Sequence, residues 1–177
     1  LPCVYHAAVA RRILDRIREK TGRVFHSTQP DVFTAMALPV FTPSYVRAGR
    51  PFTLHGISSK SNGGAAVSKN GAEVVARFVR EFGDYRIHST LYPGIEVSAN
   101  LVVDAMLVAM EAFPEYYRGM RFNYEAMWAF LYKIGNVHKR EIFEKRREIR
   151  RFHRFSVPRS PVTSMLGASF CSPACVT

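Results

Sequence analysis

Apolar residues recur at helical spacing along most of the chain. The first such pattern predicts a helix over residues 4–20, with apolar positions three or four residues apart at Val9, Ile13, Leu14 and Ile17. Arginine and aspartate residues fill the positions between them. Gly22 follows, and it predicts the end of this helix because glycine adopts the left-handed backbone conformation at the lowest cost.

Further helices are predicted over 30–38, 72–82, 100–113, 124–134 and 138–155. In the helix over 30–38, Asp31 is expected to cap the free backbone amides, and Pro39 and Pro43 are expected to end the helix. In the helix over 72–82, five residues are expected to point inward: Val74, Val75, Phe78, Val79 and Phe82. Only 24–25 and 52–55 are typical of short strands. A helix-rich chain with so few strands has no sheet of its own to complete, which is the first indication of a fragment.

The length of 177 residues suits one ordinary domain or a large piece of one. We predict three segments: 1–113, two or more helices over 114–155, and a Ser- and Pro-rich tail over 156–177. No apolar run approaches the roughly 20 residues that cross a bilayer. The longest, Leu101–Met110, is interrupted by Asp104 and predicts a buried helix.

The formal charge of +11, from 25 basic and 14 acidic side chains, predicts attraction to an anionic partner. The chain has three cysteines, at positions 3, 171 and 175. An odd number argues against a disulfide framework and favours a reducing compartment. Cys171 and Cys175 lack a second Cys or His pair that would complete a zinc site.

Four segments are rich in side chains that commonly bind ligands or catalyse reactions: 25–32, the Ser-, Gly- and Asn-rich stretch 56–64, 88–93 and the basic run 138–155. The first of these places Asp31 at a predicted helix start. A stretch as rich in Ser, Asn and Gly as the second often lines a binding site.

The order of these segments resembles bacterial family 2 glycosyltransferases. The residues that carry the resemblance are a helix containing Arg12–Ile17, then Thr21–Phe25, Pro30–Ala35 and Gly56–Gly63. The resemblance covers roughly residues 1–113. It implies a nucleotide-sugar enzyme with a GT-A-type α/β domain, of which this helix-rich chain would be an incomplete later part, without most of the nucleotide-binding sheet.

The resemblance also implies roles for particular residues. Asp31 matches the carboxylate that takes a proton from the acceptor hydroxyl of a saccharide or lipid-linked acceptor. The polar loop would bind substrate through Ser58, Ser59, Lys60, Ser61 and Asn62. In such enzymes an earlier Asp-x-Asp motif holds Mg²⁺ or Mn²⁺ against the nucleotide diphosphate.

The chain itself lacks that motif. Its four aspartates are Asp15, Asp31, Asp84 and Asp104, and no two of them form Asp-x-Asp. We therefore assign no metal ligand here, expect the metal-binding half before Leu1, and expect this chain alone to be inactive.

Simpler interpretations compete with these roles. Asp31 fits a helix cap, and 56–64 fits a plain connecting loop. His55 and His88 could each ligate a metal, but a single histidine beside a strand more often has a structural hydrogen bond.

The basic run 138–155 contains eight Lys or Arg and three Glu, with an apolar stripe at Ile142, Phe143, Ile149 and Phe152. A solvated amphipathic helix is the first interpretation, an anionic membrane surface the second and nucleic acid the third. No nucleic-acid-binding motif supports the last, so no nucleic acid is expected. The alternative function is a non-enzymatic basic helical module that binds an anionic surface or nucleic acid, in which these charges merge with those of Arg11, Arg12, Arg16 and Arg18. The expected location is cytoplasmic, with contact to the inner face of the membrane as a further hypothesis.

Overall fold

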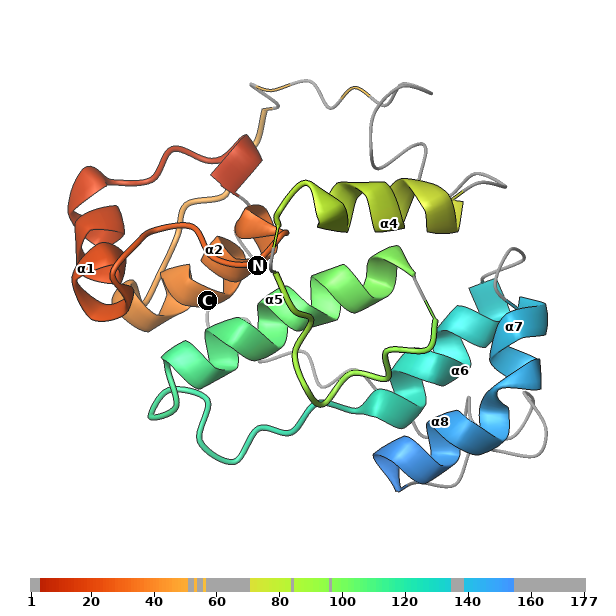
Figure 1. Cartoon of the computed structure of the whole chain (residues 1–177). Helices are drawn as coiled ribbons and strands as arrows, with labels where there is room; N and C mark the ends of the chain where they lie inside the picture. Colours follow the sequence, from red (N-terminus) through yellow and green to blue (C-terminus); the bar gives the residue numbers. More distant parts are fainter. Residues whose placement is uncertain are drawn as a thin grey trace. The chain divides into compact units, whose positions relative to one another are not determined.

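The structure, a computed structural model, describes residues 4–50, 53, 56, 71–83, 85–95, 97–134 and 139–154. These ranges contain helices and no strand (Figure 1). The elements are η1 (Val4–His6), α1 (Arg11–Thr21), α2 (Pro30–Phe41), α4 (Gly71–Arg80), α5 (Ser98–Ala112), α6 (Tyr124–Ile134), α7 (Lys139–Glu144) and α8 (Arg146–His153). The prediction of a helix-rich chain is confirmed.

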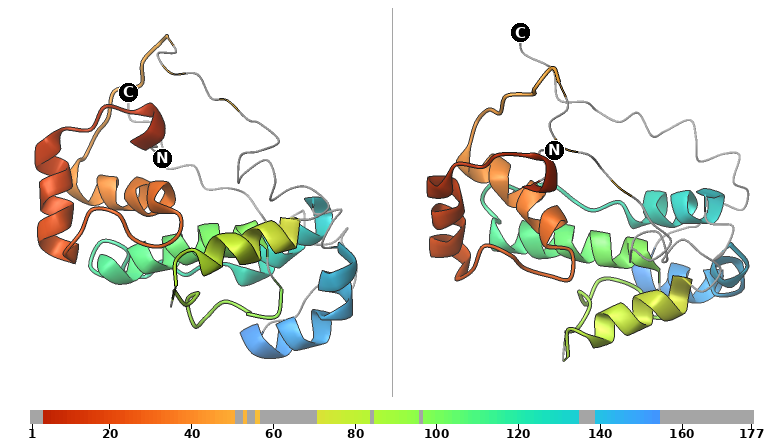
Figure 2. Two further views of the ribbon diagram at one scale, coloured as in Figure 1. Left: turned by 45° about the horizontal axis from the view of Figure 1, so that its top comes forward. Right: turned by 90° about the horizontal axis from the view of Figure 1, so that it is seen from above.

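The chain divides into two compact units, residues 1–121 and 122–177. In the first, α2 packs along α5, and α1 packs against α2 (Figures 1 and 2). The three fully buried alanines Ala37, Ala105 and Ala109 keep the α2–α5 contact close, because small side chains let two backbones approach. The larger members of this core are Ile17, Phe33, Met36, Leu38, Phe113 and Tyr117.

The predicted helix over 4–20 is two elements. Residues 4–6 form the short 3-10 helix η1, and α1 begins only after Ala10, whose backbone is extended. The end of α1 is as predicted. Gly22 has a left-handed backbone with φ of 81°, and its N–H donates a 2.7 Å hydrogen bond to the carbonyl of Arg18.

Helix α2 continues past Pro39, so the predicted end at residue 38 is wrong. A proline inside a helix removes one hydrogen bond and usually ends it. Here Met36, Ala37 and Leu38 are buried in the core of the first unit, which stabilises the helix around the proline. The predicted cap is also wrong, because Gln29 occupies the N-cap position and no side chain caps the helix.

Residues 24–25 form no strand; they lie in the loop between α1 and α2, where the Phe25 side chain is 55% exposed. Most of the second predicted strand, 52–55, lies outside the described residues. Of the side chains expected to point inward from the helix at 72–82, Val75 is buried. Phe82 is not, because α4 ends at Arg80 and leaves this ring 45% exposed.

Helix α5 confirms the buried helix that the run Leu101–Met110 predicts. Its buried side chains include Leu101, Val103, Asp104 and Leu107. None of the helices in the described ranges combines the length and the apolar character that a bilayer span requires.

In the second unit, α6 packs against α7 and α7 packs against α8. Trp128 of α6 is 2% exposed, and its ring lies 6.2 Å from that of His153 on α8. The predicted helix over 138–155 is divided at Lys145 into α7 and α8. Ile142 and Ile149 are buried as predicted, whereas Phe143 is 51% exposed and Phe152 is 42% exposed. The predicted apolar stripe is therefore half right, because the chain turns between the two short helices. The predicted tail over 156–177 lies outside the described residues.

Candidate functional site

A buried carboxylate joins three segments of the first unit. Asp104, on α5, is fully buried. Its Oδ2 accepts a 2.7 Å hydrogen bond from the Ser27 hydroxyl and another from the Tyr85 hydroxyl. Its Oδ1 accepts a 2.7 Å bond from the backbone N–H of His88. A charge can stay inside a protein when both oxygens are satisfied in this way, so the cluster is a stable polar centre.

Two of the four segments that the sequence singled out meet at this centre. Ser27 belongs to 25–32, and His88 opens 88–93; each binds a different oxygen of Asp104. Ser27 has a left-handed backbone with φ of 62°, which costs about 1 kcal/mol for a residue with a Cβ. Its hydrogen bond to Asp104 helps to hold that conformation.

The hydroxyl of Tyr85 completes the cluster. It lies 3.1 Å from the Ser27 hydroxyl as well as next to Asp104. Burial raises the pKa of Tyr85 above its ordinary value, and the hydrogen bond to Asp104 raises it further. The phenol therefore keeps its proton and acts as a donor to the carboxylate.

His88 has protein partners at both ring nitrogens. Nδ1 lies 2.8 Å from the Thr90 hydroxyl, and Nε2 lies 2.7 Å from Glu111. These contacts describe a histidine that ties the loop before α5 to the exposed face of α5. They favour the structural interpretation of His88 over a metal-ligand role.

His26 holds the turn between α1 and α2 through hydrogen bonds to Thr21 and Arg23. Its Nε2 lies 3.0 Å from both the Thr21 hydroxyl and the Arg23 carbonyl, and its ring lies 4.5 Å from that of Phe33. Burial lowers the pKa of His26 below 6.5; the hydrogen bond to the Arg23 carbonyl acts against this shift, and the charge of Arg23 adds to it. The ring is neutral near pH 7, and the turn from α1 into α2 is held by hydrogen bonds.

Asp31 lies in the first turn of α2 and, unlike Asp15 and Asp104, has no partner among the described residues. Its side chain is half-buried, and its carboxylate has no hydrogen bond or ion pair to any described residue. Asp15, in contrast, lies 3.1 Å from Arg11 and 2.9 Å from Arg18. The positive end of the helix dipole stabilises an anion at this position, so Asp31 is a charged acceptor without a protein partner in the described part of the chain.

A second polar group without a partner lies three residues before Asp31. The Thr28 side chain is 2% exposed, and its hydroxyl oxygen makes no hydrogen bond within the described residues. Buried hydroxyls in proteins nearly always have a partner. The start of α2 therefore has two polar groups without a partner in the described part of the chain, the buried Thr28 hydroxyl and the half-buried Asp31 carboxylate.

The predicted binding loop Ser58, Ser59, Lys60, Ser61 and Asn62 lies outside the described residues, as do His55 and Asp84. A cleft shared by that loop and Asp31 therefore stays a prediction. Within the described ranges, no group of three or more His, Cys, Asp or Glu side chains is arranged to hold a metal ion.

Sequence reasoning gave Asp104 no role in the site. The signal was present, because Asp104 is the one charged residue inside the apolar run Leu101–Met110. An acid in a helix that must be buried needs hydrogen-bond donors from elsewhere in the fold. Those donors come from positions 16 to 77 residues away, and sequence alone does not identify them.

The chain matches no family model, no curated protein and no solved structure in the comparisons made.

Proposed function

We propose that the chain is the later part of a sugar transferase, in which Asp31 takes the proton from an acceptor hydroxyl while a nucleotide-sugar donor gives up its sugar. One observation carries the proposal. Asp31 is a half-buried carboxylate at a helix start, and it has no partner in the described part of the chain. The resemblance to family 2 glycosyltransferases over roughly residues 1–113 assigns the same residue the same role.

The chemistry needs a carboxylate of this kind. A sugar hydroxyl is a weak nucleophile until a general base within hydrogen-bond reach takes its proton. The carboxylate of Asp15 is ion-paired with two arginines through Oδ1, and both oxygens of Asp104 accept hydrogen bonds from three donors. Neither oxygen of Asp31 has a partner among the residues that the structure describes, which supports its assignment as the base.

The Asp104 cluster supports the proposal by holding Asp31 in place. Ser27 precedes Asp31 by four residues, and its bond to Asp104 connects the loop before α2 to α5. The same helices are joined by the packing of Phe33 and Ala37 in the core. A base that is fixed relative to its scaffold needs no costly ordering when the substrate arrives.

The residues proposed to bind the substrates lie outside the described ranges. Ser58, Ser59, Lys60, Ser61 and Asn62 are proposed to bind the acceptor or the donor phosphates through hydroxyls, amides and one positive charge. The resemblance implies that Mg²⁺ or Mn²⁺ would be held by an Asp-x-Asp motif in a preceding part of a longer polypeptide, where it would offset the charge on the leaving diphosphate.

The first experiment is to read the coding sequence upstream of Leu1. A segment with several β-strands and an Asp-x-Asp motif is the expected result. The longer protein would then be assayed for sugar transfer with a panel of uridine, guanosine and thymidine diphosphate sugars and Mn²⁺.

The decisive variant is Asp31→Asn in that longer protein. It removes the base and keeps the size of the side chain, so transfer should fall by a factor of about 10² or more. Asp15→Asn is the matched control and should keep its activity, since Asp15 makes only exposed ion pairs. Full activity in Asp31→Asn, or an upstream sequence with no nucleotide-binding segment, would reject the proposal.

A further inference from the structure

The second unit carries a row of arginines along one face of α8. Arg147, Arg150 and Arg151 lie three and four residues apart, a spacing that places side chains on the same side of a helix. Arg154 follows at the C-cap. The row spans about 10 Å at 1.5 Å per residue.

The inner side of α8 is already occupied. Ile149 is 1% exposed, and the ring of His153 stacks on Tyr124 at a centroid distance of 4.5 Å. The Trp128 ring lies 6.2 Å from the same histidine. These contacts fix which side of α8 faces α6, so the arginine row points away from the interior of this unit.

The four arginines of the row have no carboxylate within ion-pair distance among the described residues. Neighbouring basic residues do have one: Arg140 lies 2.8 Å from Glu144, and Lys145 lies 3.2 Å from Glu141. The positive charge of the row is therefore not offset within the described part of the chain, and it suits an anionic partner.

An exposed aromatic side chain lies beside the row. The Arg146 guanidinium lies 4.0 Å from the centre of the Phe143 ring and donates a 2.6 Å hydrogen bond to the Phe143 carbonyl. Arg146 precedes Arg150 by one helical turn, so it connects the Phe143 ring to the row. Phe143 is nevertheless 51% exposed.

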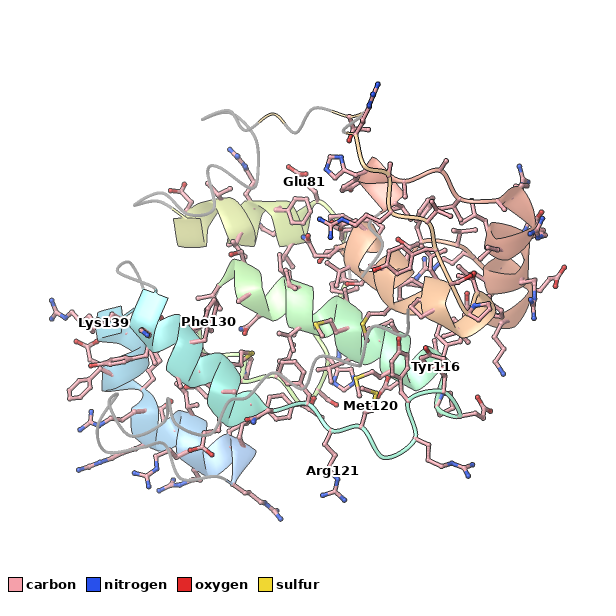
Figure 3. All side chains as sticks on the ribbon, turned by 180° about the vertical axis from the view of Figure 1, so that it is seen from behind. Glu81, Tyr116, Met120, Arg121, Phe130 and Lys139 are labelled. Atoms are coloured by element: carbon pink, nitrogen blue, oxygen red, sulfur yellow. The ribbon has the colours of Figure 1, made fainter. Side chains whose placement is uncertain are left out.

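A shallow hollow adjoins the same ring. It has a volume of about 410 Å³ and lies between α6 and α7, lined by Tyr132, Lys139, Arg140 and Phe143. Lys139, the first residue of α7, lies over the Tyr132 ring at 5.1 Å and is labelled in Figure 3. Arg140 is already paired with Glu144, so Lys139 and the two aromatic rings are the groups of this hollow that suit a phosphate attached to an apolar body.

We propose that the surface formed by Phe143, Arg146, Arg147, Arg150, Arg151 and Arg154 docks onto an anionic phospholipid bilayer. The arginines contact lipid phosphates, and the Phe143 ring enters the boundary between headgroups and acyl chains. A short amphipathic helix with arginines on its polar face and exposed aromatic residues nearby has the chemistry of interfacial binding.

A nucleic acid fits these observations less well. Proteins that bind single strands use open aromatic faces on which bases stack. One face of the exposed Phe143 ring is covered by Arg146 at 4.0 Å. Insertion of a ring edge into a bilayer does not need that face to be open.

The test is co-sedimentation of the chain with vesicles of phosphatidylcholine, alone and with added phosphatidylglycerol. Binding is expected only to the anionic vesicles and should weaken as salt rises. A variant with Arg147→Gln, Arg150→Gln, Arg151→Gln and Arg154→Gln should bind roughly several hundred-fold more weakly, at about fivefold for each arginine.

The matched control makes the same charge change in the first unit: Arg80→Gln, Arg86→Gln, Arg118→Gln and Arg121→Gln. These exposed arginines also lack ion pairs to described residues, so the control separates position from net charge. It should keep most of the affinity. Phe143→Ser should weaken binding about tenfold or less with the charge unchanged. Far-UV circular dichroism verifies that each variant is folded.

Three results would overturn the proposal. The two fourfold variants could bind anionic vesicles equally, which would show a general effect of net charge. The wild-type chain could bind neutral and anionic vesicles equally. It could also ignore vesicles and bind a single-stranded RNA oligonucleotide through the same four arginines, which would identify a nucleic acid as the partner. Because α8 lies outside the proposed catalytic residues, none of these results depends on sugar transfer.

Discussion

The Ser27 hydroxyl donates a 2.7 Å hydrogen bond to Oδ2 of Asp104, across 77 residues of sequence. The backbone of Ser27 is in the left-handed conformation, and Asp104 is a fully buried residue of α5. The left-handed conformation of Ser27 and the burial of the Asp104 carboxylate would each cost free energy without the hydrogen bond between them. Together they connect the loop before α2 to α5, and this connection can be measured.

Asp104→Asn should destabilise the first unit by about 3 kcal/mol, because the new amide group turns an acceptor oxygen into a donor that faces other donors. The measurement is urea unfolding followed by far-UV circular dichroism, since the single Trp128 reports only on the second unit. Asp15→Asn is the control and should cost less than about 0.5 kcal/mol, as expected for an exposed pair. Equal stabilities of the two variants would contradict a central role for Asp104.

Ser27 offers a test of backbone strain against hydrogen bonding. Ser27→Ala removes the bond to Asp104 and keeps a Cβ in the left-handed conformation. Ser27→Gly removes the same bond but also the steric cost of the Cβ. The glycine variant should therefore be more stable than the alanine variant by about 1 kcal/mol in the same urea experiment. The opposite order would show that Ser27 is not strained in solution.

Asp31→Asn should change the stability of the first unit little. The carboxylate has no protein partner in the described residues, so only its interaction with the helix dipole is lost. That interaction is worth about 0.3–1 kcal/mol. A small change in the urea midpoint, together with a large loss of transfer in the longer protein, would separate a catalytic role from a structural one. A loss above about 3 kcal/mol would mean that Asp31 has a structural partner.

Tyr117 links α2 to the turn after α5. Its hydroxyl donates a 2.6 Å hydrogen bond to the carbonyl of Met36, and burial raises the pKa of Tyr117 to about 12. Tyr117→Phe keeps the buried ring and removes this bond, so the first unit should lose about 1 kcal/mol. Spectrophotometric titration of the tyrosines gives a second measurement, because the variant should lose one of the groups that ionise at high pH. An unchanged midpoint would show that solvent satisfies the Met36 carbonyl equally well.

The second unit should lose stability in acid. Burial lowers the pKa of His153 from 6.5 to about 4, so the unfolded chain binds a proton more readily than the folded unit between these values. The contribution of the neutral ring is complete above about pH 6.5 and is lost as the pH falls towards about 4. The slope is at most about 1.4 kcal/mol per pH unit and is reduced because the ring is only partly buried.

Trp128 fluorescence during urea unfolding at several pH values measures this slope, because Trp128 lies 6.2 Å from His153. His153→Phe keeps an aromatic ring against Tyr124 and cannot take up a proton. It should remove most of the dependence between about pH 4 and pH 6.5. If the unfolding free energy of the variant changed with pH as steeply as that of the wild type, other titratable groups would be responsible for the loss of stability in acid.

The helical character of this protein was determined by local sequence. The spacing of apolar residues predicted α5 and α6 closely, and Gly22 predicted the end of α1, because these features depend on contacts within one or two helical turns. The same reasoning failed at Pro39, where burial of Met36, Ala37 and Leu38 carries α2 past a residue that normally ends a helix. It also failed at 138–155, because the chain turns at Lys145 and leaves Phe143 and Phe152 exposed.

The candidate site shows the same division. The sequence by itself marked Asp31 as an acid at a helix start and Asp104 as an acid in an apolar run. Only the tertiary structure decided that Asp104 is satisfied by Ser27, Tyr85 and His88, while Asp31 has no partner among the described residues. Hydrogen bonds that close loops of 16 to 77 residues depend on how whole helices pack, and helix packing follows from the sum of many weak contacts that no single segment encodes.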